Sequence, residues 1–207
     1  MESGGGRKAV FITLLLALFL LTVRAAAADV VINEFLANGA VEPGSEWVEL
    51  YNNGTAAVDI TGWNITDGES NSNFTFPAFI LEPGSFVLAV RDSAQFNATF
   101  NDSLFFNSSV TVFEYKTDAP GLQLANGGDQ LFLFANDVAG TLQDSIAFGA
   151  QSEGVSQGRF PDGVDLATVS FTRPTPSNRN DNVPPLINTA LVEINGEIGR
   201  ASCRERV

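Results

Sequence analysis

Histidine is absent from this 207-residue chain, and cysteine, methionine and lysine are scarce, with one Cys, one Met and two Lys. A single cysteine, Cys203, excludes a disulfide framework, and without His it also excludes a Cys/His zinc site. Acid–base chemistry would fall to carboxylates, Lys116 or tyrosine, and the spacing of these residues indicates no catalytic site. The sequence therefore predicts that the chain is not an enzyme and needs no cofactor.

Basic side chains are also few. The formal net charge is −13, and between Asp29 and Gly196 five basic residues stand against 21 acidic ones. A surface of this sign repels phosphate backbones, so nucleic acid is excluded as a partner. We expect most of the acids to form a solvated surface.

The first 28 residues have the pattern of a secretory signal peptide, for which we expect a helix. Arg7 and Lys8 give the positive start, residues 9–23 are apolar, and residues 26–28 are three alanines of a cleavage site. An uncleaved membrane anchor is the alternative, but a spanning helix needs about 20 apolar residues. We therefore predict a protein that is secreted or held at the cell surface, begins at Asp29, and meets the membrane only through its signal peptide.

The last residues, 197–207, read EIGRASCRERV and contain three arginines and the only cysteine. This string matches the translation of a common short-read sequencing adapter in one frame. A genuine basic tail is the alternative. We expect an artefact, and we expect the natural protein to continue beyond Gly196.

From Asp29 onward, short apolar or alternating runs are separated by Gly, Pro, Asn and Asp, which is typical of an all-β sandwich or barrel. In the run Glu46–Tyr51, Trp47 and Glu49 face one side. The run Gln130–Phe134 can be buried on both faces. The other predicted strands are Val30–Leu36, Ala57–Ile60, Trp63–Thr66, Phe74–Ile80, Phe86–Val90, Val110–Tyr115, Ser145–Phe148 and Val169–Thr172.

Two stretches lack the pattern of a strand. Asp92–Ser109 carries scattered Phe among Asn, Ser and Asp, and we interpret it as a long loop or insertion with a short strand at Leu104–Phe106. Arg173–Pro185 is rich in Pro, Asn and Asp, as linkers are. Leu186–Ile194 would then open a second domain.

Eight short segments follow one another in a characteristic order. The most specific is Glu46–Gly68, with WVELYN, Val-Asp-Ile and Gly-Trp in succession. The others are Val31–Phe35, Phe74–Pro77, Leu81–Val90, Leu124–Phe134, Asp144–Gly149, Gly158–Gly163 and Thr172–Asn180. In this order they resemble the lamin tail domain. The chain departs from the family in an insertion near residues 92–121, which leaves the pairing of Val110–Tyr115 open.

The resemblance implies an all-β, immunoglobulin-like β-sandwich of two packed, mainly antiparallel sheets. It implies a domain over residues 29–175, with residues 176–196 as a linker or the start of a second, truncated domain. Family members form the tails of nuclear lamins or occur in secreted bacterial and archaeal proteins, often beside nuclease, phosphatase or surface-anchoring domains. The signal peptide places this chain with the secreted prokaryotic type.

The function predicted on these grounds is that of a non-catalytic binding or structural module for cell-surface or extracellular interactions. Its partner would be an extracellular protein or a glycan. The alternative is an accessory domain of a larger secreted enzyme, nuclease-like or phosphatase-like, whose catalytic part follows residue 196.

Several charged residues allow a functional interpretation, although we favour a structural one. The acids could supply a glycosidase pair or bind Ca²⁺, but no Asp-x-Asp-x-Asp-Gly loop is present, so surface charge is the preferred interpretation. Arg159 is expected to lie in a turn and to pair with a nearby acid. The acids are Glu34, Glu46, Glu49, Asp59, Asp67 and Glu69.

The aromatic residues and the glycosylation sequons also allow both a functional and a structural interpretation. Trp63 is either a sugar platform or a core residue, and we predict core packing for it and for Trp47, which shares a strand face with Tyr51. Asn64 directly follows Trp63 in a strand and is the least suitable sequon. The possible N-glycosylation sites are Asn53, Asn73, Asn97, Asn101 and Asn107.

Overall fold

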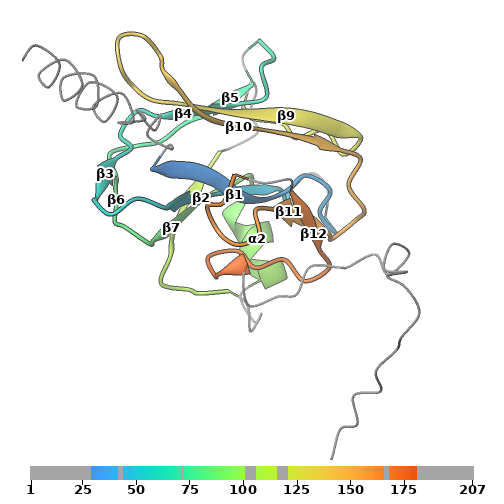
Figure 1. Cartoon of the computed structure of the whole chain (residues 1–207). Coiled ribbons are helices and arrows are strands. Elements are labelled where there is room, and N and C mark those ends of the chain that lie inside the picture. The colour runs from blue at the N-terminus through green and yellow to red at the C-terminus, as the bar shows by residue number, and fades with distance from the viewer. Residues whose placement is uncertain are drawn as a thin grey trace, which may run out of the picture.

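The computed structural model describes residues 29–41, 44–70, 72–100, 106–115, 121–165 and 168–180. Two sheets pack face to face, as Figure 1 shows, and this confirms the immunoglobulin-like β-sandwich. The signal peptide, residues 181–196 and the 197–207 segment lie outside the described residues. The elements are β1 (Val30–Leu36), β2 (Trp47–Asn52), β3 (Val58–Asp59), β4 (Asn64–Thr66), β5 (Asn73–Thr75), β6 (Ile80–Leu81), β7 (Phe86–Val90), α2 (Ser93–Phe100), β8 (Thr111–Glu114), β9 (Gly128–Phe134), β10 (Leu142–Gly149), β11 (Ser156–Gly158) and β12 (Val169–Phe171).

The two layers differ in width. The wider sheet has six strands in the order β12-β11-β1-β2-β7-β8, and the narrower has four in the order β10-β9-β4-β5. Strands β3 and β6 form a separate antiparallel pair, which Figure 1 shows at one end of the layers. Among the described strands, all pairs except β7–β8 are antiparallel, as the family resemblance implied.

The main core lies between the sheets. Alternate residues of each strand point inward, so apolar side chains from both layers meet and exclude water. Ile32 and Phe35 on β1 and Leu131 and Leu133 on β9 are fully buried. The Phe35 ring lies 4.7 Å from that of Phe148 on β10, measured between centroids.

A second apolar cluster covers the other face of the six-stranded sheet. Trp47 and Leu88 point to this face, where Phe96 and Phe100 of α2 pack on them. The two phenylalanine rings meet the Trp47 indole edge-on, at centroid distances of 6.5 and 6.1 Å. The molecule is therefore a sandwich with a helix under one sheet (Figure 1).

The prediction of a loop over Asp92–Ser109 was wrong, because this stretch contains α2. Asp92 caps the helix: its Oδ1 accepts a hydrogen bond from the Gln95 amide at 2.9 Å. Phe96 and Phe100 are four residues apart and therefore share the buried face. The short strand expected at Leu104–Phe106 lies mostly outside the described residues.

Helix α2 also explains the only parallel pairing among the described strands. Strands β7 and β8 run in the same direction, with Val87 opposite Thr111 and Val90 opposite Glu114. A parallel pair cannot be joined by a tight turn and needs a long crossover. The insertion near residues 92–121 therefore includes the crossover that places β8 at the edge of the wider sheet.

Two strand assignments also need correction. The run Phe74–Ile80, expected as one strand, is divided between β5 and β6, which belong to different sheets. Pro77 lies between them and has no N–H to continue a ladder. Strand β11 was not predicted because Ser-Gln-Gly lacks an apolar pattern. Glycine is required there, since a Cβ on Gly158 would lie 2.5 Å from the Asn33 carbonyl oxygen.

Candidate functional site

A polar network lies beneath the six-stranded sheet, where β1 is interrupted by a bulge. The register of β1 with β2 shifts between Ile32 and Glu34, so Asn33 is the extra residue. The Asn33 side-chain amide donates to Glu49 Oε1 and to Asp162 Oδ1, both at 2.9 Å. Its oxygen accepts from the Gly163 amide at 3.0 Å. One side chain therefore links two strands to the loop after β11.

Glu34 and Glu49 form a cross-strand pair with like charges. They lie directly opposite each other in the register of β1 and β2, and both are 0% exposed. Burial raises the pKa of Glu34 to about 7. Burial, together with the proximity of Glu34, holds the pKa of Glu49 well above its usual value. Two ionised carboxylates opposite each other in a sheet repel, and the pair is destabilising unless one of the two carboxyl groups is protonated.

The hydrogen bonds around Thr175 point to the same protonation state. The Thr175 Oγ1 lies 2.6 Å from Glu34 Oε2 and 2.7 Å from Asn180 Oδ1. The Asn180 amide nitrogen donates to the Arg159 carbonyl at 2.8 Å, which fixes its oxygen as an acceptor. A hydroxyl has one proton and cannot donate to two acceptors. The contacts are all satisfied when Glu34 is protonated and donates to Thr175, which donates to Asn180.

Arg159 connects this network to the opposite sheet. Its guanidinium is 2% exposed, donates to the Ile32 carbonyl at 2.9 Å and pairs with Asp144 of β10 at 2.8 Å. Asp144 in turn accepts from the Ile32 amide at 2.7 Å. Burial raises the pKa of Asp144 more than the guanidinium lowers it. The predicted pairing of Arg159 with an acid is confirmed, and Asp165 is a second partner at 3.0 Å.

The polar network is closed by the C-terminal part of the described chain. The backbone amides of Thr175, Ser177 and Asn180 donate to Glu34, Glu49 and Asp162, respectively. Thr175, Ser177 and Asn180 are all buried. The packed domain therefore extends to Asn180, five residues past the expected boundary at residue 175. Since these groups seal the acids from solvent, the network stabilises the fold and offers no access to a substrate.

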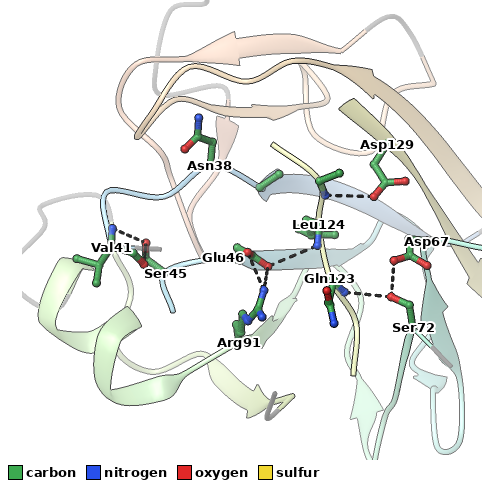
Figure 2. Close-up of polar contacts among 12 residues, drawn as sticks. Asn38, Val41, Ser45, Glu46, Asp67, Ser72, Arg91, Gln123, Leu124 and Asp129 are labelled. Carbon is green, nitrogen blue, oxygen red and sulfur yellow. Dashed lines mark hydrogen bonds and ion pairs between the residues drawn. The ribbon is translucent and has the colours of Figure 1, made fainter. Parts of the chain in front are cut away.

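A separate buried ion pair fixes the segment before β9. Glu46 is paired with Arg91 at 2.8 Å, and both side chains are at most 10% exposed. Figure 2 shows Glu46 between Arg91 and the Leu124 amide, and Ser72 between Asp67 and the Gln123 amide. These contacts hold the extended residues 122–125 against the sandwich.

The six acids therefore fall into two groups. The expectation of surface charge was wrong for Glu34, Glu46 and Glu49, which are at most 2% exposed. Each lies in or beside an apolar strand. Its burial is tolerated because polar partners that are far away in the sequence form hydrogen bonds or ion pairs with its carboxyl group. The other three are exposed or half-buried; they are Asp59, Asp67 and Glu69. The described residues include no group of three or more His, Cys, Asp or Glu side chains that could hold a metal ion.

The outer face of the four-stranded sheet has a different chemistry. One row across the strands is Thr75, Asn64, Phe134 and Leu142, and the next is Asn73, Thr66, Phe132 and Ser145. At these paired positions, all of which the structure describes, no side chain is charged. We call these eight residues the outer face.

Two phenylalanines form the centre line of the outer face. The Phe132 and Phe134 rings have centroids 6.2 Å apart and planes inclined by 23°. Both are half-buried, whereas Leu131 and Leu133, which alternate with them and point to the core, are fully buried, so the two faces of β9 are not equally buried, contrary to the expectation. Leu142 beside Phe134 is 48% exposed. The rings and Leu142 therefore form an apolar strip bordered by amides and hydroxyls.

Comparison with known families identifies the domain. The family model of the Lamin Tail Domain matches residues 24–150, more than half of the chain. The chain belongs to the lamin tail domain family. No curated protein sequence matches it. The lamin tail domain is an immunoglobulin-like fold and not an enzyme family. In this chain β11, β12 and the segment that closes the polar network follow the matched residues.

Both tryptophans of this lamin tail domain are buried, in different clusters. Trp63 is 9% exposed and lies in the core between the sheets, whereas Trp47 is fully buried under α2. Tyr51 shares the strand of Trp47 but is only half-buried, and its ring stacks on Phe86 at 4.7 Å. The long apolar helix of a membrane span is not found in the described residues.

The sequons occupy different environments. Asn53, Asn73, Asn97 and Asn107 are exposed. Asn64 is half-buried, and its amide donates to Thr75 Oγ1 at 3.1 Å. Asn101 lies outside the described residues. Among the exposed four, Asn73 is on the outer face and Asn97 is on α2.

The polar network was not predicted from the sequence. Asn33, Asp162 and Asn180 lie in segments whose only recognisable feature in the sequence is their resemblance to the family. The available signal was an arginine and an acid, each next to a glycine, in Gly158–Gly163, which indicates a backbone approached closely by other polar groups. Sequence alone gave no indication that this segment meets β1.

Proposed function

We propose that this lamin tail domain is an exported, non-catalytic binding module whose partner is a neutral glycan, held on the outer face of the four-stranded sheet. The observation that supports this is the charge-free outer face in a chain with a net charge of −13. Apolar surface with a polar border commonly marks a binding site. Export is supported by the signal-peptide pattern of residues 1–28.

The chemistry of the outer face suits a sugar better than a charged protein surface. A sugar ring has an apolar C–H face, which packs on an aromatic ring, and hydroxyls around its edge. Asn64, opposite Phe134, and Ser145, opposite Phe132, offer an amide and a hydroxyl group, which both donate and accept hydrogen bonds. Neighbouring strands lie about 4.8 Å apart, so these groups flank Phe132 and Phe134 at close range.

Catalysis has no support in the same surface. The acids with raised pKa values are Glu34, Glu49 and Asp144, and the first two are fully buried among hydrogen-bonding partners. A general acid must come within hydrogen-bond reach of its substrate. An accessory domain of a larger secreted enzyme would use the same outer face to hold its substrate.

The test is binding to neutral polysaccharides by the chain from Asp29 onward, produced in the bacterial cytoplasm so that no sequon is modified. We expect retention on at least one polysaccharide in affinity electrophoresis. The double substitution Phe132→Ala and Phe134→Ala should weaken this binding by at least about tenfold, equivalent to about 1.4 kcal/mol.

The matched control is Val41→Ser, which changes an exposed apolar side chain that is 44% accessible and does not belong to the outer face. It should leave the affinity unchanged. Equal weakening by the control and the double substitution, or no binding to any neutral polysaccharide, would refute the proposal. Thermal unfolding of each variant checks that the fold is retained.

A further inference from the structure

A pocket of about 400 Å³ lies between β6, the start of β7, the turn before β8 and the C-terminal segment. This volume is within the range of about 300–1,000 Å³ that is usual for small-ligand sites. It does not include any residue of the outer face, so the pocket is a separate feature.

The apolar part of the pocket is held rigidly. The Phe79 ring meets Phe113 edge-on at 5.4 Å, and the Phe86 ring stacks on Tyr51 at 4.7 Å. Ile80 is one of the few large apolar side chains that are more than half exposed among the described residues. Hydroxyl and amide groups from Ser85, Ser109 and Asn178 also line the pocket, together with two charged residues, Glu82 and Arg179. An apolar floor surrounded by groups that donate and accept hydrogen bonds suits a sugar.

Asn107, which begins the sequon Asn107-Ser108-Ser109, forms part of the pocket wall. Its backbone is fixed on both sides: its amide donates to Ser177 Oγ at 2.8 Å and its carbonyl accepts from the Val110 amide at 3.1 Å. Its Oδ1 accepts from the Ser109 amide at 3.0 Å. This bond engages the side-chain oxygen and leaves the nitrogen, to which an N-glycan is attached, on the opposite side of the amide.

We propose that Asn107 is an N-glycosylation site and that the first sugars of its glycan fill this pocket. A ligand attached to the pocket wall binds intramolecularly, so even weak packing on Phe86 and Ile80 is sufficient to hold it. The other exposed sequon of this region, Asn97 on α2, does not line the pocket and serves as a matched internal control.

The experiment uses the chain from Asp29 onward, secreted behind a heterologous leader from eukaryotic cells that add only high-mannose glycans. This design does not depend on the native signal peptide or on glycan binding by the outer face. Glycopeptide mass spectrometry gives the occupancy of Asn107 and Asn97. The folded protein is then treated with an endoglycosidase that cuts between the first two sugars, and the release rate is measured at each site.

In the folded protein, the Asn107 glycan should be released at least about tenfold more slowly than the Asn97 glycan. Denaturation should make the two rates equal. Ile80→Ser should speed release at Asn107 several-fold and leave Asn97 unchanged, and this exposed substitution spares the core.

An unmodified Asn107 overturns the proposal, whatever the state of the other sequons. Equal release rates in the folded protein also overturn it, because they show a glycan that projects into solvent. Protection that survives Ile80→Ser overturns the assignment of the apolar floor as the surface that holds the sugars.

Discussion

Glu34 and Glu49 face each other where water reaches neither carboxyl group, so their protonation is linked to the free energy of unfolding. Folding raises the pKa of Glu34 from 4.5 to about 7. Between these two pH values the folded state keeps a proton that the unfolded state has lost. The contribution of Glu34 to stability is therefore complete below pH 4.5 and is lost as the pH rises toward 7.

We predict that the free energy of unfolding decreases between about pH 4.5 and pH 7, by up to about 3 kcal/mol at roughly 1.4 kcal/mol per pKa unit. Glu34→Gln should remove much of this decrease, because a glutamine amide can donate to Thr175 as the protonated acid does. Urea unfolding at a series of pH values measures the effect. Glu69→Gln, at an exposed site, is the control.

An unchanged pH slope in Glu34→Gln would show that Glu34 is ionised in the folded protein. A general effect of the net negative charge also lowers stability with rising pH. That effect would be altered equally by Glu69→Gln, and the comparison of the two variants separates the two causes.

At the scale of elements, helix α2 depends on a short sequence signal. Asp92 accepts the hydrogen bond that begins the helix, and two phenylalanines hold it against Trp47. Because α2 has only eight residues, its stability comes from this packing and the cap more than from helix propensity.

We predict that Asp92→Ala lowers the free energy of unfolding by about 1 kcal/mol, the usual effect of losing a cap. Asp92→Asn should have a much smaller effect, since an asparagine oxygen accepts the same hydrogen bond. Thermal or urea unfolding of both variants gives the comparison. Equal losses would mean that the negative charge of Asp92, and not its cap, supports α2.

The strands of the sandwich could be predicted from the sequence because their signals are local. Val30–Leu36 and Phe86–Val90 were assigned with the bounds that β1 and β7 have in the structure. Helix α2 was missed because its apolar face has only two residues, Phe96 and Phe100. Alternation likewise gave no warning that β1 contains a bulge at Asn33, because the shift depends on β11 and the loop beyond it.

The polar network could not be predicted for a different reason. Its members are separated by up to 147 residues, as Asn33 and Asn180 are. An acid in a strand pattern is expected at the surface unless its partners are known. Only the folded arrangement shows that Thr175 and Ser177 reach Glu34 and Glu49.

At the scale of the whole molecule, the two faces of the sandwich have different roles. The outer face of the four-stranded sheet is open and uncharged, whereas the opposite side is covered by α2 and the segment ending at Asn180 (Figure 1). The two sheets are linked through Arg159, which contacts β1 and pairs with Asp144 of β10. A substitution in the segment that ends at Asn180 should therefore affect the packing of both sheets.

This arrangement predicts where the domain ends. A chain from Asp29 to Asn180 should unfold with the same free energy as a chain that continues to Gly196. A chain that stops at Pro174 loses the hydrogen bonds from the backbone amides of Thr175, Ser177 and Asn180 to the buried acids. Each bond lost at a buried charged or polar group costs about 1–3 kcal/mol, so the total should be at least about 3 kcal/mol.

Since whole domains are stable by only about 5–15 kcal/mol, the chain ending at Pro174 should be close to unfolding at room temperature. Urea unfolding followed by tryptophan fluorescence is suitable, because Trp63 and Trp47 lie in the two different clusters and the emission therefore follows both. Thr175→Val, which removes one hydroxyl and keeps the side-chain shape, should produce a partial loss of the free energy of unfolding.

If the chain ending at Pro174 is as stable as the one ending at Asn180, water replaces residues 175–180 at no cost in free energy. The raised pKa of Glu34 should then fall toward its usual value, because water stabilises the ionised form of a carboxyl group.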